Sequence, residues 1–210
     1  MSYYLTMKIT LLSYTPNPET NIASAARICY DSKPKTLEEE RKFIKGLVKS
    51  GHCSTIEHSS ATFRIDGVSR ALTHELVRHR LFSFSQRSQR YVKENEPNYV
   101  TPDVLTGDNS DNPKLAAAKT IFDDAMKTAW GVYETLLGLG LKPEDARYVL
   151  PNACCTSITV SGNFREWRNF LELRLSPRAQ WEIRKAANVI LDELIKIAPS
   201  VFEDLKEKNT

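Results

Sequence analysis

The segment 76–93 concentrates groups that bind anions. It contains no acidic residue. Its five cationic side chains are Arg78, Arg80, Arg87, Arg90 and Lys93. A guanidinium grips phosphate through two parallel hydrogen bonds, and the hydroxyls of Ser83, Ser85 and Ser88 add further donors. Like charges repel one another unless an anion or solvent offsets them. A solvated basic loop is one interpretation, but the passage from a semi-apolar stretch into a Ser-rich turn favours an anion cradle.

A second charged residue, Arg174, lies on an apolar stripe. The pattern predicts a helix over 163–174, on which Arg174 shares a face with Trp167, Phe170 and Leu171. A charge on such a stripe needs a partner or an exit to water. The alternative to a functional contact is a side chain that reaches solvent at the helix C-terminus, where the helix dipole also favours a cation.

The spacing of these residues matches a known motif. Arg78-His79-Arg80, then Ser88 after seven residues, has the RHR-x7-S pattern of flavin-dependent thymidylate synthases. Further matches in family order are Ala25-Ala26-Arg27, Gly51-His52, Ser54, Glu57-His58, Ala146-Arg147, Leu150-Pro151, Asn163, Asn169-Phe170-Leu171, Arg174 and Ala179-Gln180-Trp181-Glu182-Ile183. The matches are collinear from about residue 25 to 183, so the chain resembles this family.

The resemblance implies an activity. A member of the family converts dUMP to dTMP by reductive methylation, with 5,10-methylenetetrahydrofolate as carbon donor and tetrahydrofolate as product. FADH2, itself reduced by NADPH, would supply the hydride. The resemblance further implies a homotetramer with sites shared between subunits. It also implies one α/β domain of α+β type over residues 1–210, with a small central sheet and surrounding helices.

The resemblance also assigns residues to ligands. The residues implied for dUMP are Glu75, Leu76, Val77, Arg78, Gln86, Arg87, Ser88, Gln89, Arg90, Arg147 and Arg174. Those implied for FAD are His52, Ser54, Arg78, His79, Arg80, Gln86, Asn163, Phe164, Arg165 and Asn169. Among them Ser88, Arg90 and Arg147 would surround the phosphate. Arg174 would be catalytic, because a permanent cation beside uracil stabilises the negative charge that develops as N3 loses its proton.

Three other functions remain as alternatives. The clustered histidines, from His52 to His79, suggest a metal site, but their spacing fits neither HExxH nor HxxEH, and no metal is expected. The pair Cys154-Cys155 could hold a nucleophile, although a pair in a Thr- and Val-rich strand is more often buried packing. An RNA-binding module would use the basic 78–93 segment, yet no RRM, KH or OB signature supports it.

The elements that must position these residues form a mixed pattern. Strands are expected over 7–14, 61–65 and 153–160, and helices over about 36–50, 68–80, 112–138, 163–174 and 177–197. Thr36 with Glu39 forms a capping box, and Asn112-Pro113 is a second helix start. The acidic stretch 97–112 is expected to be a surface loop.

Composition restricts the class of protein. The formal net charge is only +3, which argues against a general nucleic-acid binder. No apolar run approaches the roughly 18 residues needed to span a membrane, so no membrane partner is expected. The cysteines, Cys29, Cys53, Cys154 and Cys155, form no CxxC pair, which favours reduced thiols in a cytoplasm.

Overall fold

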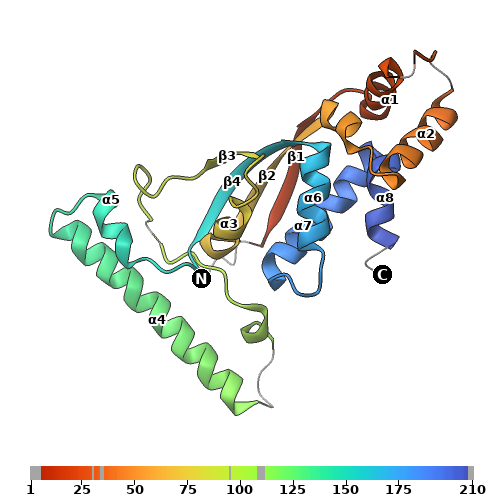
Figure 1. The fold of residues 1–210 in the computed structure, drawn as a ribbon. Helices are drawn as coiled ribbons and strands as arrows, with labels where there is room; N and C mark the ends of the chain where they lie inside the picture. Colours follow the sequence, from red (N-terminus) through yellow and green to blue (C-terminus); the bar gives the residue numbers. More distant parts are fainter. Residues whose placement is uncertain (1–5, 30, 34–35, 95, 108–111, 208–210) are drawn as a thin grey trace. The chain divides into compact units, whose positions relative to one another are not determined.

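Four strands form one antiparallel sheet in the order β1-β2-β4-β3 (Figure 1). They are β1 (Lys8–Tyr14), β2 (Ser60–Ser69), β3 (Ser83–Gln86) and β4 (Cys155–Asn163). The computed structural model describes residues 6–29, 31–33, 36–94, 96–107 and 112–207. Alternate residues of β2 are buried, as expected for a strand that packs one face against a core. The predicted α+β class, with a small sheet and surrounding helices, is confirmed.

The helices account for most of the described chain. They are α1 (Pro18–Ile28), α2 (Leu37–Lys49), α3 (Arg70–Leu76), α4 (Pro113–Gly138), α5 (Pro143–Ala146), α6 (Phe164–Arg174), α7 (Trp181–Ile197) and α8 (Pro199–Glu207). Three short 3-10 helices are η1 (Cys53–His58), η2 (Asp103–Leu105) and η3 (Arg147–Val149). The predicted capping box of Thr36 and Glu39 opens α2, and Asn112 caps α4, so both predicted helix starts are confirmed.

The chain divides into two compact units, each described here by itself. The first comprises residues 1–8, 66–74 and 86–158, and its core contains Met126, Trp130 and Tyr133 from α4. The second comprises 9–65, 75–85 and 159–210. Its core centres on Trp167, whose ring lies 4.4 Å from Phe82 and 5.0 Å from Phe63 between centroids. Gly162 belongs to this packing, because a Cβ at that position would overlap the Phe82 ring.

The predicted helix over 68–80 is wrong at both ends. Strand β2 continues through Ser69, and α3 covers only Arg70–Leu76. The Ser69 hydroxyl accepts a hydrogen bond from the Leu72 amide at 3.0 Å, which starts the helix later than the apolar spacing suggested. The helix predicted from residue 177 begins instead at Trp181, where Gln180 caps it. Strand β3 and helices α5 and α8 were not predicted, and α1 was indicated only by the family match at Ala25-Ala26-Arg27.

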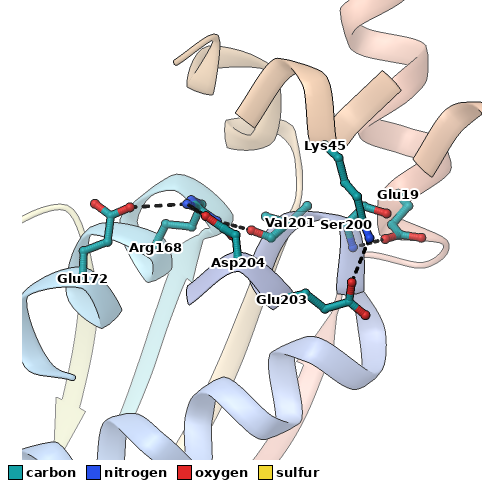
Figure 2. Close-up of polar contacts among 8 residues, drawn as sticks. All are labelled: Glu19, Lys45, Arg168, Glu172, Ser200, Val201, Glu203 and Asp204. Carbon is teal, nitrogen blue, oxygen red and sulfur yellow. Dashed lines mark hydrogen bonds and ion pairs between the residues drawn. The ribbon is translucent and has the colours of Figure 1, made fainter. Parts of the chain in front are cut away.

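A buried cation fastens α8 within the second unit (Figure 2). The Arg168 side chain of α6 is 7% exposed and lies between carboxylates of α6 and α8. Its Nη1 donates to the Val201 carbonyl and to Asp204 Oδ1, and its Nη2 donates to Asp204 Oδ2 at 2.8 Å and Glu172 Oε1 at 3.3 Å. Burial by itself lowers the pKa of Arg168, but the hydrogen bonds and charge of Asp204 more than offset this, and the pKa is raised overall. The guanidinium therefore stays protonated.

We expect replacement of Asp204 with alanine to destabilise the fold by about 2 kcal/mol, because it leaves Arg168 largely buried and short of counter-charge. The cost is smaller than for a fully buried pair, since Asp204 itself is 36% exposed. Urea unfolding would measure it. Asp192→Ala is the matched control, because it breaks the exposed Lys206 pair and should cost less than about 0.5 kcal/mol. Equal effects of the two variants would contradict this role of Arg168.

Candidate active site

In the second unit, Arg174 is held at the end of α6 by two partners from the α3 region. Its Nη1 donates to Glu75 Oε2 at 2.7 Å, and its Nη2 donates to the Glu75 carbonyl at 3.4 Å. Its Nε donates to His79 Nε2 at 3.1 Å. The Arg174 side chain is only 21% exposed, so it does not simply extend into solvent. The charge on the apolar stripe has a partner, and N–H groups on both Nη atoms remain for a ligand.

His79 is the buried member of this group. Its ring lies 5.1 Å from the Phe170 ring and 6.2 Å from the Phe82 ring, between centroids. Burial, with a smaller effect of the Arg174 charge, lowers the pKa of His79 from 6.5 to about 4. The imidazole is therefore neutral at pH 7, and an unprotonated Nε2 can accept a hydrogen bond from Arg174. On the other side, His79 Nδ1 lies 3.8 Å from Glu166 Oε1.

This pKa predicts how stability changes with pH. An unfolded histidine binds a proton near pH 6.5, whereas His79 in the folded chain binds one only near pH 4. Between these values the unfolded state binds more protons, so the free energy of unfolding falls as the pH falls, by up to about 1.4 kcal/mol per unit. The contribution is complete above pH 6.5 and lost by about pH 4.

Denaturant titrations between pH 4 and 7 would measure it, and the slope should be shallower in His79→Asn. The charged groups beside His79 are Arg174 and Glu166 on α6, with Glu75 of α3 bound to Arg174. They are present in both proteins, so the comparison isolates the imidazole. Equal slopes in the two proteins would contradict the buried neutral state of His79.

The residues predicted for FAD in the second unit have different environments. His52 and Ser54 are exposed at the start of η1, and Arg78 and Arg80 are exposed cations. Arg165 is exposed and pairs with Glu57 at 2.5 Å. Two further residues have structural roles: Asn163 caps α6, and Phe164 is buried against Phe202. Asn169 is exposed. Of the predicted dUMP residues here, Leu76 is buried and Val77 is exposed.

The first unit contains the other arginines of the predicted dUMP set, and acids hold them. Arg87 Nη1 donates to both carboxylate oxygens of Glu94, at 2.8 and 3.1 Å. Arg90 Nε donates to Glu144 Oε2 at 2.5 Å, while the Ser88 hydroxyl accepts from the Arg90 amide at 3.1 Å. The hydrogen bond from Arg90, together with the Arg90 charge, lowers the pKa of Glu144.

Arg147 joins this group through the backbone, because its Nε donates to the Glu144 carbonyl at 3.1 Å. Gln86 donates from Nε2 to the hydroxyls of Thr73 at 3.0 Å and Thr156 at 3.3 Å, and Gln89 is buried. The structure thus brings Ser88, Arg90 and Arg147 to one carboxylate-bearing turn.

Sequence reasoning missed Arg70. Its Nη2 donates to the Arg87 carbonyl at 3.0 Å, and its buried Nε has no hydrogen-bond partner among the described residues. Burial lowers the pKa of Arg70, and the charges of Arg147 and Arg87 add to the effect against the opposing charge of Glu94. A cation in such surroundings fits an anion that would offset its charge. The only signal in the sequence was an arginine directly after a strand. Because the sequence predicted a helix over 68–80, Arg70 appeared to lie within that helix and the signal was not visible.

The acids near these residues were not predicted as site residues. Glu57 pairs with Arg165, Glu94 with Arg87 and Glu144 with Arg90, while Glu166 lies 3.8 Å from His79. Of these acids the sequence analysis marked only Glu57, in the Glu57-His58 family match. In chemical terms, one unit presents arginines and a hydroxyl suited to phosphate, and the other presents a positioned guanidinium suited to a developing negative charge.

These features define an α+β protein whose arginines suit phosphorylated ligands, and comparison with known proteins identifies its family. A family model described as "Thymidylate synthase complementing protein" matches residues 10–200. A "Flavin-dependent thymidylate synthase" of Clostridium tetani is 43% identical over 220 residues, covering 94% of this chain and 86% of the relative. Proteins of the same name from Geobacter sulfurreducens and Sulfolobus acidocaldarius are 42% and 39% identical, each over 94% of this chain and over 86% and 76% of their own. The chain therefore belongs to the flavin-dependent thymidylate synthase family, and it is an enzyme.

Across the described residues, no helix combines the length and the apolar character needed to cross a bilayer. Cys29 is exposed at the end of α1.

Proposed function

We propose that this enzyme converts dUMP to dTMP by reductive methylation. The carbon donor is 5,10-methylenetetrahydrofolate, the folate leaves as tetrahydrofolate, and NADPH is the reductant. The observation that carries the proposal is the state of Arg174: a partly buried guanidinium, fixed at Nε and Nη1, that retains N–H groups for a ligand. Family membership supports the substrate.

The nucleotide is held by its phosphate and activated at its base. Ser88, Arg90 and Arg147 bind the phosphate, because a hydroxyl and two guanidinium groups match its oxygens. Arg174 faces the uracil and stabilises the charge that develops when N3 loses its proton, which makes C5 a better nucleophile. An arginine side chain stabilises this charge as a fixed cation, so the stabilisation needs no proton transfer to the residue itself.

Flavin binding uses the chain's own donors. FAD, when bound, supplies the hydride that completes the methyl group. The exposed cations Arg78 and Arg80 suit its pyrophosphate, and His52, Ser54 and Asn169 are exposed polar groups that can orient it. Arg165 is paired with Glu57 through Nη1, which leaves N–H groups on Nε and Nη2 for the flavin. Gln86 is bound to Thr73 and Thr156 through Nε2, so its Oε1 is the atom that can meet the flavin without loss of these bonds.

We further propose that the protein acts as a homotetramer of single-domain subunits, in the cytoplasm, with each site shared between subunits. The residues proposed for the phosphate, Ser88, Arg90 and Arg147, belong to one compact unit, and Arg174 belongs to the other. Neither unit alone contains both groups. In a shared site, the phosphate-binding residues of one subunit would meet Arg174 of another.

A reconstitution assay tests the proposed reaction. Product dTMP should form only when FAD, methylenetetrahydrofolate and NADPH are all present, and the folate product should be tetrahydrofolate. The flavin absorption spectrum should shift on addition of dUMP. Dihydrofolate as product, or turnover without flavin, would contradict the proposal. A protein that takes up no FAD and yet shifts RNA at low salt would instead be an RNA-binding module.

Cysteine variants separate this mechanism from covalent catalysis. Burial raises the pKa of Cys154 to about 12, so its thiol is protonated at neutral pH and a poor nucleophile. We expect Cys29, Cys53, Cys154 and Cys155 each to be replaceable by alanine with turnover within about threefold, allowing some packing loss at the buried pair. Steady-state assays on folded, FAD-loaded variants would measure this. One such variant without detectable turnover would restore a covalent mechanism.

A further inference from the structure

Glu166 is a buried carboxyl group that has no part in the proposed reaction. It lies on α6 and is 3% exposed, next to the buried Trp167. Burial raises its pKa, and a hydrogen bond with Asn169 opposes that shift. Its backbone amide is capped by the Asn163 side chain at 2.9 Å, but this bond does not need a carboxyl group at position 166. A buried acid is costly, so its location calls for a partner.

The partner that faces Glu166 is His79. Glu166 Oε1 lies 3.8 Å from His79 Nδ1, with both side chains 4% exposed. This distance is longer than a hydrogen bond, yet in a buried setting the carboxyl oxygen still attracts an N–H that points at it. A shift of under about 1 Å would close the contact.

The opposite ring nitrogen fixes which tautomer His79 adopts. Arg174 donates from Nε to His79 Nε2 at 3.1 Å, and an arginine has no acceptor with which to receive a proton. Nε2 must therefore be unprotonated, and in a neutral ring the proton lies on Nδ1, facing Glu166. The other tautomer would point two N–H groups at each other and leave Glu166 with no donor from His79, only its hydrogen bond with Asn169.

We propose that Glu166 is a positioning residue for Arg174, acting through His79. By stabilising the proton on Nδ1, Glu166 adds to the preference for the tautomer that the Arg174 hydrogen bond requires, and so keeps Nε2 available to Arg174. Glu75 then fixes Nη1 of Arg174 from a second direction, so the guanidinium has one orientation. This role rests on the proposed contact of Arg174 with uracil, whereas the tautomer can be observed without substrate.

The test replaces Glu166 with leucine, which has similar volume and no acceptor. We expect the fraction of His79 in the Nδ1–H form, read from imidazole 15N chemical shifts of the ligand-free protein, to fall. We expect kcat to fall by about 10- to 100-fold, with KM for dUMP within about threefold, because a misaimed Arg174 affects the transition state more than binding. Glu166→Gln retains an acceptor oxygen and should recover much of both properties.

Glu172→Leu is the matched control. Glu172 lies on the same helix, is exposed and contacts Arg168 rather than His79, so neither the 15N shifts nor kcat should change. If Glu166→Leu is folded and keeps wild-type 15N shifts, or changes tautomer without loss of kcat, the proposal is wrong. If Glu166→Leu does not fold, the same two readouts in Glu166→Gln and Glu166→Asp decide, since an unaltered tautomer and kcat in both would overturn it. Full turnover by an Arg174 variant would refute the proposed catalytic role of Arg174. That outcome is distinguishable from failure of the Glu166 proposal, because the tautomer of His79 is measured without substrate or turnover.

Discussion

Arg174→Lys should lower kcat by at least about a hundredfold while FAD binding changes little. The size follows from the loss of a transition-state donor, which commonly costs a factor of 10² to 10³. Lysine keeps the positive charge but offers a single ammonium. It cannot reach Glu75 and His79 with separate nitrogens and still present a planar pair of N–H groups to uracil.

The measurement is steady-state turnover at saturating dUMP, with FAD content read from absorbance. Arg178→Lys is a control, since Arg178 is an exposed arginine shortly after α6, and it should retain full activity. If Arg174→Lys turned over at close to the wild-type rate, Arg174 would have no catalytic role, and charge alone would explain any binding effect.

Two inactive variants should restore activity when they share an oligomer. Arg90→Ala loses phosphate anchoring, and Arg174→Ala loses uracil activation. If each site takes Arg90 from one subunit and Arg174 from another, mixed oligomers contain some sites with both defects and some with neither. Random reassembly of equal amounts would leave up to about a quarter of the sites intact. Activity should therefore rise well above that of either parent.

The control for this experiment is a mixture of Arg90→Ala with Arg147→Ala. Both residues contact Glu144 within one chain, so every site would lack one of them and no activity should return. Native mass spectrometry must show mixed oligomers in both cases. If it does and the Arg90 and Arg174 mixture stays at the parental level, the site is contained within one subunit.

Local signals predicted the starts of α2, α4 and α6 and the mixed class of helix and sheet, because capping and alternation depend on neighbours in sequence. Thr36 with Glu39 and Asn112 acted as expected. The helix over 68–80 failed because apolar spacing there fits both a buried strand end and a helix, and the Ser69 hydroxyl decides between them. Strand β3 is too short to show a period.

The candidate site was predictable in its arginines and not in their partners. The apolar stripe showed that Arg174 needed a partner, but Glu75 lies 99 positions away in the chain. Nothing in a single sequence reports such pairings. For the same reason the buried state of His79 and the orphaned Nε of Arg70 became visible only once the elements were assembled.

If Arg90 binds the nucleotide phosphate as proposed, its pairing with Glu144 affects the affinity of the site. In the ligand-free chain, the carboxylate already occupies Arg90 at 2.5 Å. An anion that binds Nε of Arg90 must replace this carboxylate, so the net gain at that nitrogen is the difference between two pairings rather than the strength of one. A phosphate dianion can outcompete one carboxylate, whereas a nucleoside without phosphate brings nothing to exchange. Glu144 therefore reduces the advantage of the nucleotide over an uncharged nucleoside, relative to arginines without a paired acid.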